Sequence, residues 1–460
     1  MRLSTLKKYV SGVREGIKEY VEKTGAKPNK YKAIKHFPKA FVATEKQRGS
    51  THLTKQIEEL DWRPIIGNYL EEEVSNEKTF IGVVDEIYNK NKELINNRVG
   101  KDDNTQKVGV WLKNFIAEIL VRDFEGGLTD DELIEELHLF LTTIKTGDYK
   151  QNVLIFLEGV YLGTNQINFN DTIVLRKSQK KDFVWYEHEG TSLFSPIDFF
   201  AVTGSILEIN ACGKLIVNMM DYIGKYLMVM RLYRLGSVYP KRIKTTQQSP
   251  LIGRRMFWSS SSLRHTEKYK YTIVPQAKRN FIKFSKEIVI QYEGWKKNGN
   301  QFKIDIALER YYHALLEPLD KERSLMTAVM GLEAILSKSK DRGENAYKLS
   351  MRTAKLMGAI GYDPKEVYKT VDYCYGIRNS VVHGRQIKGL KSAVINDNSK
   401  KILEYLRLSL VFCMGFTGEN SEEHINVIED SLLNSGSGNS LKAIVDKTNG
   451  KMGNTLSNFR

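Results

Sequence analysis

Cysteine is scarce in this 460-residue chain, which contains only Cys212, Cys374 and Cys413. An odd, sparse set without metal-ligand spacing argues against a disulfide framework and favours reduced thiols in a cytoplasmic protein. Long apolar runs are also missing. The most apolar long stretch, residues 215–233, carries several polar and charged side chains and predicts a core helix rather than a membrane span. The charged first 20 residues lack the apolar segment of a signal peptide. We therefore expect a cytoplasmic protein without a membrane partner.

The common catalytic and cofactor-binding sequences are missing too. The chain has no Walker A sequence, no His-Glu-x-x-His, no Gly-x-Ser-x-Gly and no Cys-x-x-Cys. We therefore expect no cofactor and no metal site, although carboxylates that are scattered in the sequence could still converge in space.

Positive charge is what the chain has in excess, with 70 Lys and Arg against 55 Asp and Glu, a formal net charge of +15. Between Lys241 and Lys283 there are eleven Lys or Arg and a single acid, Glu267, with aromatic residues interleaved. Cationic side chains combined with stacking rings are typical of single-stranded nucleic-acid binding. The RNA-binding candidates are Arg254, Arg255, Trp258, Arg264, Lys268 and Lys270. The alternative is a solvated basic face whose aromatic residues belong to the core.

The pattern of apolar and polar residues divides the chain into four regions, and its length also predicts more than one domain. We expect a helical region over 1–147, a mixed α/β domain with the basic segment over 148–300, a helical domain over 301–434 and a loosely ordered tail over 435–460. The fold class is α+β and mostly helical. Within the mixed domain the patterns predict strands over 152–162, 172–177 and 182–188, a helix over 214–235, a loop-rich stretch over 239–264 and a linker over 293–300.

One helix of the C-terminal region combines strong end signals with reactive side chains. Asp363 is a capping residue, and Gly384 is a natural left-handed stop that places His383 in the last turn. A His there can hold or release a proton near neutrality, which suits acid–base chemistry. Arg378 lies five positions earlier, about 140° away around an ideal helix. The two side chains can therefore meet one phosphate only if the long Arg wraps round or a second copy supplies the missing partner.

Arg-x4-His in this setting resembles the catalytic motif of the HEPN superfamily of ribonucleases. The segments MTAVMGLEAIL (326–336), LSMRTAKLMG (349–358) and VDYCYGIRNSVVHG (371–384) are similar to the Apea-like HEPN family, over about 303–418. The resemblance implies a C-terminal HEPN-like helical bundle, preceded by the mixed α/β domain, that forms a homodimer. It also implies RNA as partner and metal-independent cleavage by attack of the ribose 2′-OH, as in a toxin-like or antiviral defence effector.

The resemblance also assigns roles to residues of this helix. Arg378 would stabilise charge on the transition state, His383 would act as general acid or base, and Asn379 would orient the phosphate or the imidazole. Glu333, on a predicted helix over 321–337, projects between apolar positions and should be half-buried. A half-buried carboxylate needs a cationic partner, for which the candidates are Arg378 and Arg352. Glu333 is then either a support for the motif Arg or part of an ordinary structural ion pair.

Two other function classes stay open on the sequence. A catalytically inactive HEPN protein would use the same helices as an RNA-binding or dimerisation scaffold. A protein-interaction module would use its basic face to meet an acidic partner.

Overall fold

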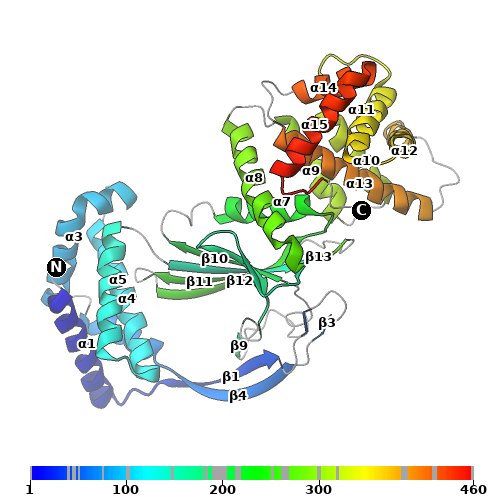
Figure 1. Ribbon diagram of the computed structural model, residues 1–460. Helices are drawn as coiled ribbons and strands as arrows, with labels where there is room; N and C mark the ends of the chain where they lie inside the picture. The colour runs from blue at the N-terminus through cyan, green and yellow to red at the C-terminus, as the bar shows by residue number, and fades with distance from the viewer. Residues whose placement is uncertain are drawn as a thin grey trace.

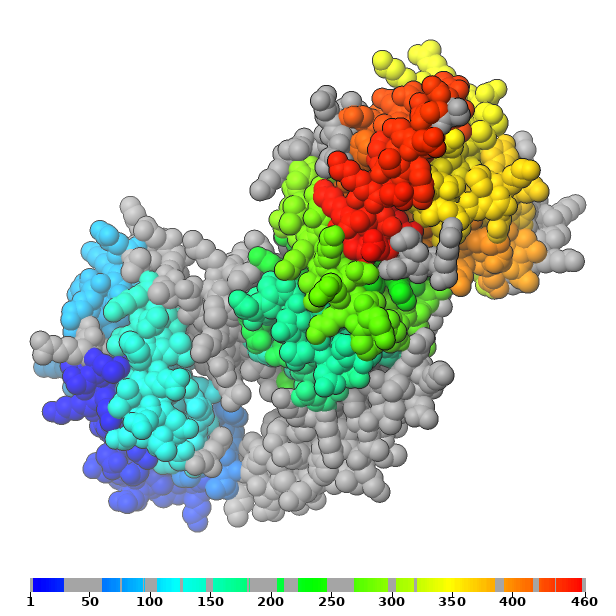
Figure 2. Space-filling view, in the orientation of Figure 1, coloured from blue at the N-terminus to red at the C-terminus, as the bar shows by residue number. Residues whose placement is uncertain are grey.

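The computed structural model describes most of the chain (Figure 1). The described residues are 3–38, 42–43, 48–49, 52–74, 77–99, 104–146, 150–179, 182, 185–188, 205–212, 219–249, 253–260, 269–297, 302–317, 321–384, 392–416 and 422–456. Figure 2 shows the N-terminal helices (blue and cyan) and the C-terminal helices (yellow to red) at opposite ends of the molecule. The fold is mostly helical α+β with an antiparallel sheet between the two ends.

The N-terminal end is a helical bundle with its own apolar core. Its helices are α1 (Leu3–Thr24), α2 (Arg63–Tyr69), the π-helix η1 (Leu70–Val74), α3 (Lys78–Val99), α4 (Asn104–Gly126) and α5 (Asp130–Thr146). Leu6 of α1, Leu112 of α4 and Phe140 of α5 are fully buried in this core. The turn between α4 and α5 follows from local chemistry: Gly127 takes a positive φ of 76°, and Thr129 and Glu132 form a reciprocal capping box.

Residues 1–147 are not purely helical, which corrects the sequence-based expectation. The strands β1 (Asn29–Pro38) and β4 (His52–Asp61) pair antiparallel over their full length. Short β2 (Val42–Ala43) and β3 (Arg48–Gly49) pair between them. The other edge of β1 pairs with β9 (Trp185–His188), a predicted strand from the middle of the chain. Pairing across so many residues is a tertiary effect that a local pattern does not reveal.

The central sheet has six strands in the order β12-β11-β5-β10-β8-β7. Their bounds are β5 (Lys150–Glu158), β7 (Gln166–Asn168), β8 (Ile173–Lys177), β10 (Ser205–Cys212), β11 (Tyr239–Ser249) and β12 (Gly253–Ser260). A small parallel pair joins β6 (Val160–Leu162) to β13 (Tyr271–Ile273). Alternate side chains, such as Ile155 and Leu207, enter the core below α7 (Met219–Tyr233) and α8 (Lys278–Lys297), which cover one face of the sheet (Figure 1).

Two expectations for the middle of the chain are wrong. The stretch 239–264 contains the long antiparallel pair β11–β12 rather than mainly loops, and this pair extends the sheet beyond β5. The sequence did not predict this pair because it has few apolar residues. Antiparallel strands can form with only one face of the sheet buried. The linker expected over 293–300 begins inside α8, which runs to Lys297 after the 3₁₀ turn η4 (Pro275–Ala277). Glu293 there forms an ion pair with Lys225 of α7.

The C-terminal end consists of packed helices, as predicted. They are α9 (Phe302–Leu316), α10 (Lys321–Leu336), α11 (Asn345–Ile360), α12 (Pro364–Val382), α13 (Ser392–Gly415), α14 (Glu423–Leu433) and α15 (Ser435–Lys451). The predicted apolar stripe of α10 is buried, and so are Val367, Val371, Cys374 and Ile377 of α12. Among the described helices, none has the length and apolar character required to cross a membrane.

The tail expected to be loosely ordered from residue 435 is in fact the helix α15. The side chain of Asn434 caps it by accepting a hydrogen bond from the Gly436 N–H at 2.9 Å. Leu441, Val445 and Met452 are almost fully buried and belong to the same core as the sheet. Packing on α11 and α14 therefore orders a segment whose composition is rich in Ser, Asn and Gly.

The structure has two apolar cores, whereas the sequence pattern predicted four regions. One core belongs to the N-terminal bundle, and it ends with Ile144, close to the predicted boundary at 147. The other is a single cluster of described residues, from Val153 to Leu456, that includes the sheet and the C-terminal helices. The boundary expected at 300 is therefore not a boundary between cores.

Candidate functional site

Both ends of α12 form where the sequence predicts them. At its start the Asp363 side chain accepts a hydrogen bond from the Lys365 N–H at 3.0 Å. At its end Gly384 takes a positive φ of 66°, which terminates the helix. His383 directly follows the last helical residue, and its N–H donates to the Asn379 carbonyl at 3.0 Å. The exposed imidazole is thus presented at the very tip of the helix.

Arg378 is anchored by side chains from two helices. Its Nη2 lies 3.3 Å from Oε2 of Glu333 on α10, and its Nη1 donates to Oδ1 of Asn379 at 2.9 Å. The guanidinium carbon lies 5.3 Å from the centre of the Tyr375 ring, within the range of a cation–π contact. Glu333 is half-buried, as predicted, and of its two candidate partners it is Arg378 that pairs with it.

This anchoring leaves part of the guanidinium available. Asn379 and Glu333 take up one N–H on each Nη atom, and an arginine has five N–H donors in all. The Arg378 side chain stays 25% exposed, and its buried Nε has no hydrogen-bond partner among the described residues. A fixed guanidinium with free donors is suited to a phosphate, which it can contact through two parallel hydrogen bonds.

Tyr375 is a contributor that sequence reasoning missed. It is almost fully buried, and its hydroxyl is hydrogen-bonded to Glu333. Burial raises the pKa of Tyr375, and the negative charge of Glu333 and the hydrogen bond add to the rise. The signal was present in the spacing: Tyr375 precedes Arg378 by three residues, which places both on one helix face.

The structure puts Arg352 in a different cluster from the α12 tip, and Glu333 is not its partner. The Arg352 guanidinium binds both carboxylate oxygens of Asp341, at 2.6 and 3.0 Å, and its Nε donates to Glu429 of α14 at 3.0 Å. It also donates to the Leu336 carbonyl at 2.9 Å. Because these acceptors occupy the guanidinium, Arg352 ties together helix ends rather than supporting Arg378.

The predicted RNA-binding residues fall in a different part of the fold. Arg254, Arg255 and Trp258 lie on the edge strand β12, opposite Gln248, Gln247 and Lys244 of β11. Lys270 is exposed just before β13, whereas Arg264 and Lys268 lie outside the described residues. Figure 1 shows α12 on the outer side of the C-terminal helices, away from the sheet. Within one chain the basic edge strand and the α12 tip are thus not brought together.

Two aromatic residues of the basic segment are core residues. Tyr271 and Phe281 are buried under the sheet and α7, where no nucleobase could stack on them. The alternative interpretation of the segment therefore holds for these two rings.

The comparisons with known proteins give no family for this chain. No protein-family model matches it, and no match was found among the curated proteins or the solved structures. A function for this chain therefore has to be inferred from its own residues and from the resemblance in its motif.

Proposed function

We propose that this protein is a metal-independent endoribonuclease whose active site forms at the α12 tips of a HEPN-type dimer. The observation that carries the proposal is the pairing of an anchored, partly exposed Arg378 with an exposed His383 at one helix end. The structural Arg352 is 3% exposed and surrounded by acceptors, whereas the Arg378 side chain is 25% exposed and meets a single carboxylate.

The proposed reaction is an internal displacement at phosphorus. The ribose 2′-oxygen bonds to the adjacent phosphorus while its proton passes to a base. The bond to the 5′-oxygen breaks, and that oxygen takes up a proton, which leaves a cyclic phosphate and a free 5′-hydroxyl. Arg378 stabilises the extra negative charge on the phosphoryl oxygens, and His383 transfers one of the protons. Asn379, which already holds Nη1 of Arg378, fixes the orientation of the guanidinium.

A second copy of the chain supplies what one α12 tip lacks. Arg378 is directed toward α10, whereas His383 lies beyond the last turn, so one chain presents them on different sides. Val382 beside His383 is 55% exposed, an apolar side chain that a partner tip would cover. In a two-fold arrangement the Arg378 of one copy and the His383 of the other face the same phosphate.

The alternative is an inactive protein that keeps these helices as an RNA-binding or dimerisation scaffold. The observation in its favour is the Glu333–Arg378 ion pair, because such a pair can stabilise the fold without any substrate. In either case the edge strand β12, with Arg254 and Arg255, is proposed to contact RNA at a separate surface, and such binding would weaken as salt rises.

The deciding experiment is cleavage of a fluorescent RNA pool by the purified full-length protein in EDTA. We expect cleavage in the wild type, and a loss of at least about a hundredfold in both Arg378→Ala and His383→Ala. Arg342→Ala and His138→Ala, at exposed positions away from the tip, are matched controls that should cleave normally. Sedimentation must show the same dimer in all five proteins.

Three results would count against the nuclease. These are cleavage that survives both tip substitutions, cleavage that EDTA abolishes, and a wild-type monomer at working concentration. RNA that is bound in a salt-dependent manner by the dimer and left intact would establish the scaffold alternative instead.

A further inference from the structure

The N-terminal bundle contains a cavity of about 510 Å³ that lies far from the α12 tip. It is an open hollow lined by α1, α2, η1 and α3, and its volume falls in the range of small-molecule sites. Part of its wall belongs to the π-helix η1, an element that is frequent at functional sites.

The lining of this cavity is aromatic and acidic. Tyr9 of α1 and Tyr69 of α2 provide the rings, and Glu73 of η1 and Glu77 provide two carboxylates, against one ammonium from Lys8. Excess negative charge is the opposite of the chain's overall +15. Rings and carboxylates together are the groups that recognise an organic cation, through cation–π contact and ion pairing.

The position of each ring is fixed by the helices around it. A Cβ at Gly16 of α1 would lie 2.0 Å from the Tyr69 hydroxyl oxygen, so Tyr69 packs directly on the α1 backbone. The Glu77 N–H donates to the Val74 carbonyl at 3.0 Å, which holds the Glu77 backbone at the end of η1. The Tyr69 ring and the Glu77 backbone are therefore preformed, which lowers the entropic cost of binding a ligand.

Tyr9 lines this cavity, but its hydroxyl is turned into the protein. Its hydroxyl oxygen is buried, and no described residue hydrogen-bonds to it. Burial raises the pKa of Tyr9, and the charge of Glu77 raises it further, so the phenol is neutral and Glu77 acts on it directly. Because this oxygen is buried in the protein, Tyr9 offers the cavity its ring and not its hydroxyl.

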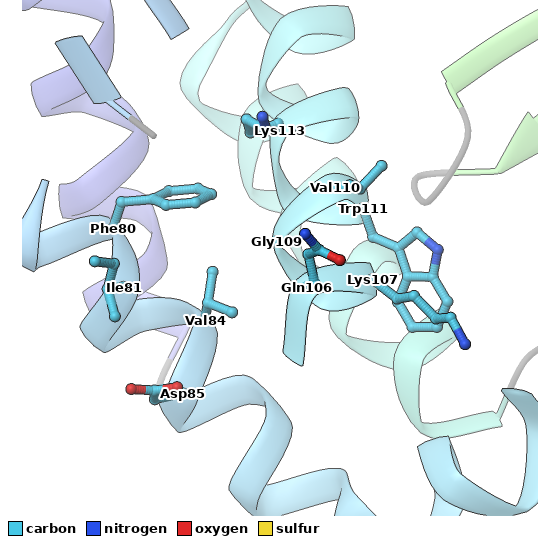
Figure 3. A pocket seen from close by; sticks show the side chains of 10 residues that line it. All are labelled: Phe80, Ile81, Val84, Asp85, Gln106, Lys107, Gly109, Val110, Trp111 and Lys113. Atoms are coloured by element: carbon cyan, nitrogen blue, oxygen red, sulfur yellow. The ribbon is translucent and has the colours of Figure 1, made fainter. Parts of the chain in front are cut away.

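A second cavity of the same bundle shows the contrast. It has a volume of about 470 Å³ and lies between α3 and α4 (Figure 3). Phe80, Ile81 and Val84 line it from α3, and Gly109 and Val110 line it from α4. Its wall is mainly apolar, and its charged residues are one carboxylate, Asp85, and two cations, Lys107 and Lys113, so it lacks the acidic excess of the first cavity.

We propose that the cavity between α1, α2, η1 and α3 binds a small organic cation. The positive group of the ligand lies between the Glu73 and Glu77 carboxylates, and its apolar body rests against the rings of Tyr9 and Tyr69. This binding is independent of the proposed RNA cleavage, because none of its residues belongs to the α12 tip.

The test is titration calorimetry of the full-length protein with three flat probes of nearly one shape. Benzamidinium carries the positive charge, benzamide is neutral and benzoate is negative. We expect binding of benzamidinium only, and about tenfold weaker binding in Glu77→Gln, equivalent to about 1.4 kcal/mol. Glu93→Gln removes the same charge from the exposed face of α3 and should bind normally.

A second pair of variants tests whether the cavity itself is the site. A Cβ at Gly12, which lines the cavity, meets nothing within 4 Å, so Gly12→Leu fills the space without a clash. Gly82→Leu makes the same change at an open helix position on α3 that does not line the cavity. We expect Gly12→Leu alone to abolish binding. The proposal is overturned if benzamidinium releases no heat, if benzamide binds equally well, or if both Leu variants bind like the wild type.

Discussion

Arg352 and Arg378 lie on neighbouring helices of one core, α11 and α12, and both meet carboxylates, yet their surroundings differ. The Arg352 side chain is 3% exposed and has acceptors on three sides, from Asp341, Glu429 and the Leu336 carbonyl. The Arg378 side chain is 25% exposed and meets a single carboxylate, that of Glu333, at 3.3 Å. A guanidinium saturated by its own protein holds helix ends together, whereas one with free donors can bind an anion from outside.

The largest expected effect is a difference in unfolding free energy between substitutions of the two arginines. Arg352→Met keeps an apolar stem but leaves Asp341 and Glu429 without their cation, so unfolding in urea should become about 3–5 kcal/mol easier. Arg378→Met removes a partly exposed pair and should cost less than about 1 kcal/mol. Equal losses in the two variants would remove the distinction and make Arg378 an ordinary structural residue.

The next prediction concerns the helix that supports the Arg352 side. Because α15 packs on α11 and α14, truncating its fully buried Leu441 to Ala should destabilise the protein by about 3 kcal/mol. Lys447→Ala, at an exposed position of the same helix, should stay within about 0.5 kcal/mol of the wild type. The measurement is again urea unfolding. If Leu441→Ala is as stable as the wild type, α15 does not contribute to the stability of the core.

The contrast between the arginines also marks how far the sequence could lead. The start of α12 at Asp363, its stop at Gly384 and the half-burial of Glu333 follow from local rules, and all three were predictable. The partners of Arg352 were not, because Glu429 is 77 residues away and comes near only when α14 packs. Likewise, β11 and α15 have weak local patterns, and their structures depend on distant neighbours.

Acid should weaken the ion pairs of Arg352 with Asp341 and Glu429. Hydrogen bonds from Arg352 lower the pKa of Asp341 to about 2 from its ordinary 3.8. A lowered carboxyl pKa stabilises the fold above the unfolded value, and this contribution is lost as the pH falls from about 4 through 2. The full contribution is about 2 kcal/mol, of which about 1 kcal/mol is lost by pH 3.

The check is the difference in unfolding free energy between pH 6 and pH 3. Asp341→Asn should lack that part of the loss, whereas Asp430→Asn, an exposed control, should keep it. An Asp341→Asn variant with the same acid sensitivity as the wild type would mean that the cluster does not hold this carboxylate ionised.

The smallest expected effect tests how Arg378 is held. Tyr375→Phe keeps the ring beneath the guanidinium but removes the hydroxyl bound to Glu333, so it should cost about 1 kcal/mol of stability. Tyr373→Phe, two residues earlier, is the control and should be nearly neutral. If Glu333 positions Arg378 through this hydrogen bond, RNA cleavage by Tyr375→Phe should fall in kcat with little change in KM, because a misplaced guanidinium loses contact with the transition state. A loss of stability with unchanged kcat would make the Tyr375–Glu333 bond purely structural, and Arg378 would then differ from Arg352 only in its exposure.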